Sequence, residues 1–271
     1  MKLAVSNIAW PVEQDAAVAA ALSTLRVQAI EVAPTKIWPS PLEATGVQID
    51  AYRRFWETRG LSIVAAQSLL FGQPHLTLFE NAATRSRTLE YLRGMIRVCG
   101  QLGAEALVFG SPRNRQVGDA DQTAAWQAAV EFFGRLGEAA AEVGTVIAME
   151  ANPPEYGADF VTRATKALEL VRAVNHRGFR LHLDSACMTL AGDPVTLIGE
   201  SLQLLQHFHI SEPGLAAIGS GAVKHAEFAL QLRAHAYGRW ISIEMREGQP
   251  FTLDALSAAV RYATDIYVAE S

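Results

Sequence analysis

The clearest structural unit of the sequence is residues 126–150, WQAAVEFFGRLGEAAAEVGTVIAME. Its first part places apolar residues three and four positions apart, which predicts an amphipathic helix; these residues are Trp126, Val130, Phe133, Leu136, Ala140 and Val143. Gly144 then predicts a left-handed helix stop. The apolar run Val146 to Glu150 predicts a strand that is buried on both faces. A helix leading directly into a buried strand is the repeating unit of a parallel α/β fold.

The same alternation runs along the whole chain. Eight short apolar runs predict strands: Leu3–Ser6, Ile30–Ala33, Ser62–Gln67, Ala106–Ser111, Val146–Glu150, Arg180–Asp184, Gln206–Ser211 and Trp240–Met245. Further helical patterns cover Thr84–Leu102 with a stop at Gly103, Thr162–Val174, His225–His235 and Leu253–Ala269, and Asp193-Pro194 is typical of a helix cap and first turn. Eight units in 271 residues average about 34 residues each, which predicts a single (β/α)₈ barrel domain over residues 1–271.

An open Rossmann sheet is the alternative fold. It is disfavoured because the first strand is followed by Asn7-Ile8-Ala9-Trp10-Pro11, and no strand in the sequence is followed by a glycine-rich phosphate turn.

Composition limits the classes of function. Half of the residues are hydrophobic and 19% are charged, which excludes a disordered chain. The net charge of −5 disfavours nucleic-acid binding. Cys99 and Cys187 are far apart and form no disulfide framework or zinc motif. The longest uncharged stretch, residues 61–79, contains too many polar residues for a membrane span. With no secretory signal pattern at the N-terminus, we expect a cytoplasmic protein with no membrane or nucleic-acid partner.

Four of the predicted strands end in a residue that can bind a metal ion. These are Glu150, Asp184, His209 and Glu244, separated by 34, 25 and 35 residues. Each gap is about one β/α unit, so the four belong to strands five to eight at the C-terminal mouth of a barrel. Buried carboxylates are costly unless they are paired, protonated or coordinated. Three carboxylates and one imidazole suit Mn²⁺, Mg²⁺ or Co²⁺, and no thiolate set for structural zinc is present.

With these motifs the chain resembles the xylose-isomerase-like barrels of the sugar phosphate isomerase/epimerase group, particularly the ketose 3-epimerases. The resemblance rests on residues 147–153, 181–187, 207–213 and 241–246. It implies that the four strand-end residues bind one divalent ion, Mn²⁺ by preference with Mg²⁺, Co²⁺ or Zn²⁺ as alternatives. It also implies that Glu150 and Glu244 are the catalytic proton-transfer groups, acting on a carbohydrate-like substrate.

The chemistry of the residues fits that reaction. A cation bound to a carbonyl and the neighbouring hydroxyl acidifies the C–H between them and stabilises an enediolate. If one glutamate removes the proton and the other returns it, the carbon is inverted; if a single glutamate does both, an aldose and a ketose interconvert. The sequence leaves both outcomes open.

Further residues are predicted to surround the substrate. Strand alternation places His182 and His207 on the same face as the ligands, and Arg246 follows Glu244 by two residues. His207 and Glu212 resemble the first and last members of the family's H-x-H-x-x-E pattern. We therefore expect His182, His207, Glu212 and Arg246 to bind substrate, and Glu31 and Gln67 to contribute at the rim.

Two positions depart from the ketose 3-epimerases. Those enzymes usually have a histidine three residues after the metal aspartate and an arginine three residues after the glutamate of H-x-H-x-x-E. This sequence has Cys187 and Leu215 there. The departures indicate a substrate other than a free ketose: one that is smaller, one that has fewer hydroxyl groups, or one that carries a phosphate.

Apolar residues and loops near the mouth complete the sequence predictions. Pocket walls are expected from Trp10, Trp38, Leu69, Leu70 and Phe71, and a polar loop or phosphate grip from residues 110–115. The uncharged loop 68–79 needs cover, which a second subunit of a homodimer or homotetramer would provide.

The alternatives to an isomerase or epimerase are a metal-dependent lyase such as a sugar-acid or inosose dehydratase, an apurinic-endonuclease-like hydrolase, and a metal or ligand binder without activity. The acidic net charge and the single apparent ion site disfavour the nuclease.

Overall fold

The strands of the computed structural model, which describes residues 1–269, form one closed all-parallel barrel in the order β1 to β8. Each strand pairs with the next along the chain, and β8 closes the barrel against β1, with Leu3 opposite Ile241. The strands are β1 (Lys2–Ser6), β2 (Ala29–Val32), β3 (Ser62–Ala66), β4 (Ala106–Phe109), β5 (Val146–Met149), β6 (Phe179–Asp184), β7 (Leu205–Ser211) and β8 (Trp240–Glu244). The predicted (β/α)₈ barrel is confirmed, with strand ends shifted by one or two residues.

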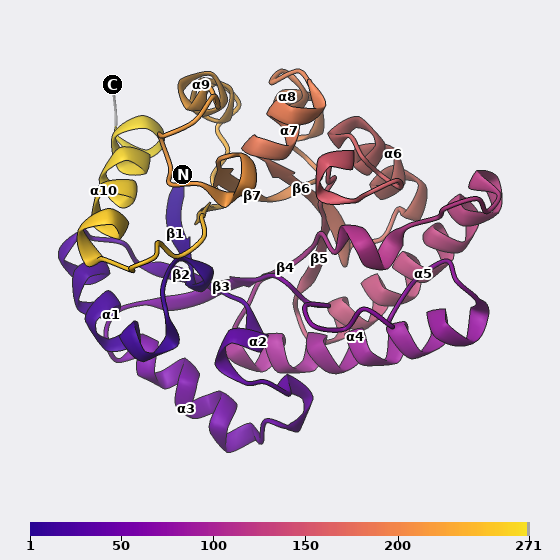
Figure 1. The fold of residues 1–271 in the computed structure, drawn as a ribbon, viewed down its shortest axis with the longest axis horizontal. Helices are drawn as coiled ribbons and strands as arrows, with labels where there is room; N and C mark the ends of the chain where they lie inside the picture. The colour runs from indigo at the N-terminus through magenta and orange to yellow at the C-terminus, as the bar shows by residue number, and fades with distance from the viewer. Residues whose placement is uncertain (270–271) are drawn as a thin grey trace.

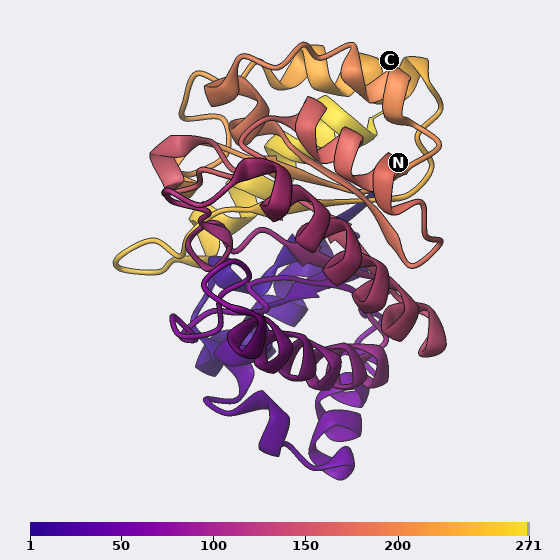
Figure 2. The ribbon, with the colours of Figure 1, turned by 90° about the vertical axis from the view of Figure 1, so that its right-hand side faces the viewer.

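Helices surround the barrel (Figures 1 and 2). They are α1 (Asp15–Thr24), α2 (Pro34–Ile37), α3 (Gly46–Glu57), α4 (Ala82–Leu102), α5 (Gln122–Glu142), α6 (Ala164–Val174), α7 (Ser185–Ala191), α8 (Leu197–Ser201), α9 (His225–Ala234) and α10 (Leu253–Ala263). Gly103 and Gly144 have φ of +96° and +78°, as their predicted role as helix stops requires. The last helix ends earlier than predicted, at Ala263, and a π-helical turn follows over Thr264–Val268.

The outer face of the strands forms the main core. Phe133 of α5 packs against Phe109 of β4 and Phe179 of β6, with ring centroids 5.1 and 4.8 Å apart. Such contacts explain the continuous apolar strands, because every strand is covered by helices on one side and fills the barrel on the other. No helix among the described residues has the combination of length and apolarity that a bilayer span requires.

The inside of the barrel changes from apolar to polar along its axis. Ala4, Ala29 and Val64 form a small separate cluster with Trp240 against it. Two residues further along β2 the inward side chain is Glu31, and along β8 it is Ser242, then Glu244. The polar layers therefore lie towards the carboxyl ends of the strands. The loops on that side include the β8–α10 loop, which projects as a yellow hairpin in Figure 2.

Asp193 caps a helix other than the one predicted. Its Oδ2 accepts a hydrogen bond from the backbone N–H of Ala164 at 2.7 Å, and its Oδ1 accepts one from Arg163 Nε at 3.2 Å. The next helix, α8, begins only at Leu197. Because Arg163 at the start of α6 makes no side-chain capping bond, the buried Asp193 carboxylate satisfies that helix end.

We predict that Asp193→Ala lowers the free energy of unfolding by about 1–3 kcal/mol, because a buried N–H loses its acceptor. Urea denaturation measures the loss. Arg163→Ala is the control: its side chain is half exposed, so removing the ion pair should cost under about 1 kcal/mol. Equal losses in the two variants would contradict the capping role.

Candidate metal centre and active site

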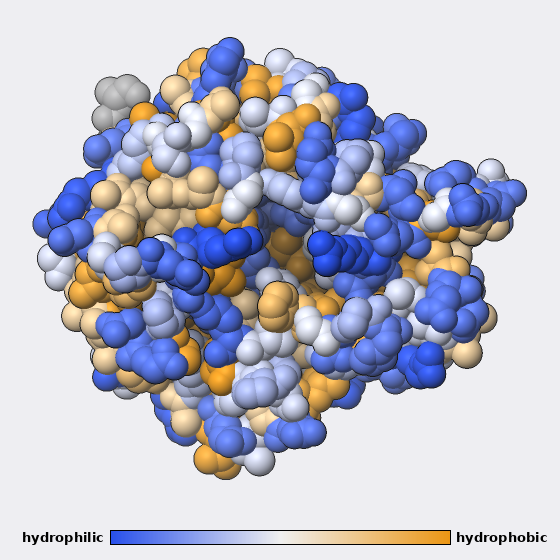
Figure 3. Space-filling view, in the orientation of Figure 1, coloured by the Kyte–Doolittle hydropathy of each residue, from blue (hydrophilic) through white to orange (hydrophobic). Residues whose placement is uncertain are grey.

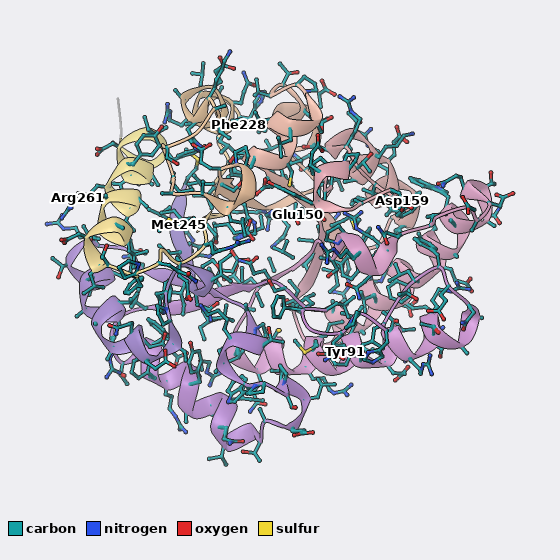
Figure 4. All side chains as sticks on the ribbon, viewed as in Figure 1. Tyr91, Glu150, Asp159, Phe228, Met245 and Arg261 are labelled. Atoms are coloured by element: carbon teal, nitrogen blue, oxygen red, sulfur yellow. The ribbon has the colours of Figure 1, made fainter. Side chains whose placement is uncertain are left out.

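The four strand-end residues predicted as metal ligands converge at the carboxyl end of the barrel. Around His209 Nδ1 lie Glu244 Oε2 at 3.3 Å, Asp184 Oδ2 at 3.9 Å and Glu150 Oε1 at 3.9 Å. Figure 4 places Glu150 near the centre of the ring of elements, where β5 ends. The carboxylates line a cavity of about 240 Å³, and the space-filling view in Figure 3 shows this face hollowed near its centre.

His182 belongs to the same cluster. Donor atoms of Glu150, His182, Asp184 and His209 all lie within 4.8 Å of one another; Glu244 is outside this group but contacts its His209 Nδ1 at 3.3 Å. The His182 ring meets the His209 ring edge-on, with centroids 4.2 Å apart. Both His182 ring nitrogens are buried without a hydrogen-bond partner, and Nε2 is 3.5 Å from Glu150 Oε1. His182 therefore lies beneath the carboxylates, within the wall of the candidate ion site.

Neighbouring groups hold the carboxylates in place. Asp184 is fixed on both oxygens, by the backbone N–H of Cys187 at 2.6 Å and by Ser211 Oγ at 2.6 Å. Glu150 Oε2 accepts a hydrogen bond from Asn152 Nδ2 at 2.8 Å. The buried Arg115 in turn donates to Asn152 Oδ1 at 2.8 Å. These contacts fix the site before any ligand arrives.

Space for Glu150 depends on a residue with no side chain. A Cβ atom at Gly110, just after β4, would collide with Glu150 Oε2. The glycine therefore leaves room for a carboxylate at the end of the neighbouring strand, which is a more specific role than the polar loop predicted for residues 110–115.

Glu31 was predicted at the rim, and the structure corrects this to a position inside the barrel. Its carboxylate is fully buried and lies 3.0 Å from His209 Nε2 and 3.2 Å from His207 Nε2. With Nε2 facing Glu31, the other nitrogen of His209 faces the carboxylate cluster. Gln67 is also buried, and its Nε2 donates to Ser6 Oγ at 2.6 Å. No sequence pattern near Glu31 indicates its partner, 178 residues away.

Electrostatics make the cluster a site for positive charge. Burial, then the negative charges of Asp184 and Glu244, raise the pKa of Glu150 to about 8. Burial also raises the pKa of Glu244. Although burial opposes a charged imidazole, Glu31 and Glu244 outweigh it and raise the pKa of His209 well above its usual value. Ionising these carboxylates side by side is therefore costly, and a bound proton or cation lowers that cost.

The donor set fits one divalent cation. Atoms that share an ion at about 2.1 Å lie roughly 3 to 4 Å apart, which is the spacing seen around His209 Nδ1. That nitrogen is buried without a hydrogen-bond partner. Glu150, Asp184, His209 and Glu244 could hold the ion, with His182 within reach, and oxygen-rich ligation suits a hard or borderline metal.

The residues predicted to bind substrate fall into two groups. Arg246 lines the cavity, as do Cys187 and Leu215 at the two positions that depart from the ketose 3-epimerases. His207 is buried below the cavity, where Nε2 also lies 3.0 Å from Ser242 Oγ. His182 and Glu212 do not line the cavity either. Sequence reasoning overlooked Asn152 and Tyr156, which line the cavity just after β5.

Glu212 faces its own loop. The fully buried carboxylate accepts hydrogen bonds from the backbone N–H groups of Gly219, Gly221 and Val223 at 3.3, 3.2 and 3.4 Å, and lies 3.2 Å from His225 Nε2. A Cβ at Gly221 would collide with Glu212 Oε2. This placement favours a role in holding the β7–α9 loop rather than in contacting substrate.

We predict that Glu212→Ala releases the loop, because three backbone donors lose one shared acceptor. Amide hydrogen exchange at Gly219, Gly221 and Val223 should accelerate by about tenfold or more, while affinity for Mn²⁺ stays within about twofold. Glu227→Ala, on the exposed surface of α9, is the control. Unchanged exchange at the three amides would contradict the loop-holding role.

The described fold agrees with the comparisons with known proteins. The family model described as "Xylose isomerase-like TIM barrel" matches residues 19–265. No functionally curated protein matches the chain by sequence.

Solved structures with the same fold include several sugar epimerases and a dehydratase. D-psicose 3-epimerase from Clostridium cellulolyticum H10 superposes with a TM-score of 0.81 at 14% identity, covering 99% of this chain and 100% of that one. The IolI protein with a binding zinc atom gives 0.78 at 17%, covering 100% of both chains. A probable 3-DHS dehydratase from Bacillus anthracis gives 0.74 at 17%, covering 97% and 99%. The family match extends over most of the sequence, and the chain therefore belongs to the xylose isomerase-like TIM barrel family.

Proposed function

We propose that this protein is a divalent-metal-dependent isomerase or epimerase that moves a proton next to the carbonyl group of a sugar or sugar phosphate. The observation that carries the proposal is the set of three carboxylates around the unpartnered Nδ1 of His209, at the mouth of a barrel whose structural neighbours are mainly sugar epimerases. We propose Mn²⁺ as the ion, with Mg²⁺, Co²⁺ or Zn²⁺ as alternatives, a cytoplasmic location, and a homodimer or homotetramer.

The ion supplies Lewis-acid chemistry when bound: it polarises the substrate carbonyl and stabilises negative charge on the two oxygens of an enediolate. The protein residues supply the proton transfers. Glu150 and Glu244 come from β5 and β8, with β6 and β7 between them, so their carboxylates approach a bound substrate from different sides. One removes the proton on carbon and the other returns it on the opposite face.

The two glutamates differ in how firmly they are held. Glu150 has one oxygen bonded to Asn152 and the other beside His209 and His182. The Glu244 carboxylate accepts no hydrogen bond from the described residues, and its one ion-pair contact is with His209 Nδ1, 3.3 Å from Oε2. Its carboxylate is therefore the freer of the two to follow a proton between substrate and solvent.

A dehydratase is the second candidate, because a probable dehydratase shares the fold. It would use the same first step, in which a glutamate removes the proton next to the carbonyl, and a β-hydroxyl group would then leave. Cys187 and Leu215 line the cavity and offer few polar contacts. A free ketose, with its many hydroxyl groups, requires more polar contacts than these residues provide.

We predict that Glu150→Gln and Glu244→Gln each abolish epimerisation, lowering kcat by at least about 100-fold, because a glutamine cannot transfer the proton. Substrate C–H exchange in D₂O should persist for only one of the two epimers in each variant, and for opposite epimers in the two. NMR measures this exchange across ketoses, sugar phosphates and keto-inositols in the presence of Mn²⁺.

Glu155→Gln, which changes an exposed glutamate in the β5–α6 loop, is the control. Full exchange in both active-site variants would refute the proton-transfer roles. Stoichiometric loss of water with a new enone absorbance would identify the dehydratase instead.

We also predict that Glu31→Gln weakens Mn²⁺ binding by about 10–100-fold, because Glu31 orients His209 and increases the basicity of its Nδ1. Isothermal titration calorimetry measures this affinity directly. Glu80→Gln, at an exposed position, should bind Mn²⁺ like the unaltered protein. An unchanged affinity in Glu31→Gln would mean that His209 is positioned without Glu31.

A further inference from the structure

A second cavity adjoins the metal cavity on the same face of the barrel. It has a volume of about 430 Å³ and lies between the loops that follow β3 and β4. Pro112 lines both cavities, so the two are neighbours on either side of this residue. A volume of this size is in the range of small-molecule sites, and the proposed reaction leaves it without a role.

One wall of this cavity carries an exposed aromatic side chain. Phe71 is 70% exposed, and among the large hydrophobic residues of the described chain only Val47 is more exposed. The rest of its loop is well packed, since Leu69, Leu70, Leu76 and Leu78 are all at most 5% exposed. The apolar residues of the loop are therefore mostly buried within the chain itself. The Phe71 ring remains exposed, and it lines the cavity.

The cavity is preformed. Asn114 Nδ2 donates to the carbonyl oxygens of Gln73 and Leu76 at 2.8 and 2.9 Å, which ties the two loops together. Ser68 and Ser111, one on each loop, have left-handed φ values of +58° and +46°. Such strained backbone persists only where surrounding contacts impose it, and it is concentrated at ligand sites.

The chemistry of the lining selects the ligand. Leu70, Phe71, Pro74 and Pro112 give apolar surface, and no carboxylate is among the residues that line this cavity, so a second cation does not fit. Arg113 also lines the cavity and forms no salt bridge within residues 1–269. A guanidinium group and a phenyl ring bind the faces of a planar aromatic group, whereas water competes strongly for an isolated hydroxyl.

We propose that this cavity binds an uncharged aromatic substituent on the substrate, while the carbonyl-bearing sugar occupies the metal cavity. The inference rests on the proposed function and names the substrate class as sugars linked to an aromatic group. It also explains why Cys187 and Leu215 replace polar residues around the sugar, because binding free energy then comes from the substituent.

The test uses hydroxamates, which chelate the ion as an enediolate would. Calorimetry measures the binding of glycolohydroxamate to the Mn²⁺-loaded protein. It also measures the binding of three series of hydroxamates that carry alkyl linkers of increasing length. One series ends in a phenyl ring, one in a phosphonate and one in a methyl group.

We expect the best phenyl compound to bind at least about tenfold more tightly than its methyl counterpart, because the ring loses contact with water. Phe71→Ala should remove most of that gain and leave the affinity for glycolohydroxamate unchanged. Leu230→Ala, which truncates an exposed leucine on α9, should change neither affinity.

Equal affinities for phenyl and methyl compounds, tighter binding of the phosphonates, or a phenyl gain that survives in Phe71→Ala would each overturn the inference. A smaller oligomer in Phe71→Ala, measured by analytical ultracentrifugation, would overturn it too, since a second copy would then cover the ring. Failure of every hydroxamate to bind would refute the proposed function and this inference with it. Binding of glycolohydroxamate without a phenyl gain would refute this inference alone.

Discussion

The crowding of Glu150, Asp184 and Glu244 around one nitrogen of His209 is the constraint on which the rest of the site depends. Burial, followed by the negative charges of the neighbouring carboxylates, raises the pKa of Glu150 to about 8, so the cluster favours a bound proton or cation. The divalent cation that we propose would relieve this repulsion by supplying two positive charges. The same cation would stabilise negative charge on a substrate, which links the electrostatics of the carboxylate cluster to the chemistry we propose.

The barrel supports this cluster from below with a second layer of polar groups. Glu31 contacts both His207 and His209, and His207 also contacts Ser242, so strands β2, β7 and β8 are joined inside the barrel. These groups are buried and bonded to one another and do not line the cavity, a placement that favours a supporting role for the proposed ion site. His207 and His209 of β7 both point into the barrel, but only His209 contacts the carboxylate cluster, because His207 lies one layer further from the mouth.

The mouth of the barrel divides into two regions with different chemistry. One contains the carboxylates, Tyr156 and Arg246, and the other contains Phe71 and Arg113; Pro112 lies between them. A substrate that occupies both regions would be activated at one end and recognised at the other. Such separation lets binding energy far from the reacting carbon position it against the two glutamates.

Much of the fold and of the site was already determined by the sequence. Helical periodicity, glycine stops and buried apolar runs predict the eight units, and the repeat spacing of Glu150, Asp184, His209 and Glu244 predicts their convergence, because parallel strands present their carboxyl ends at one edge. Only the tertiary structure decided the partners of the buried polar groups. Glu31 meets His209 across the barrel, Asp193 caps α6, and Glu212 holds its own loop. The physical reason is that a buried polar atom bonds to whichever donor or acceptor the closed barrel brings within reach, and strand closure and register set that distance where local sequence patterns do not.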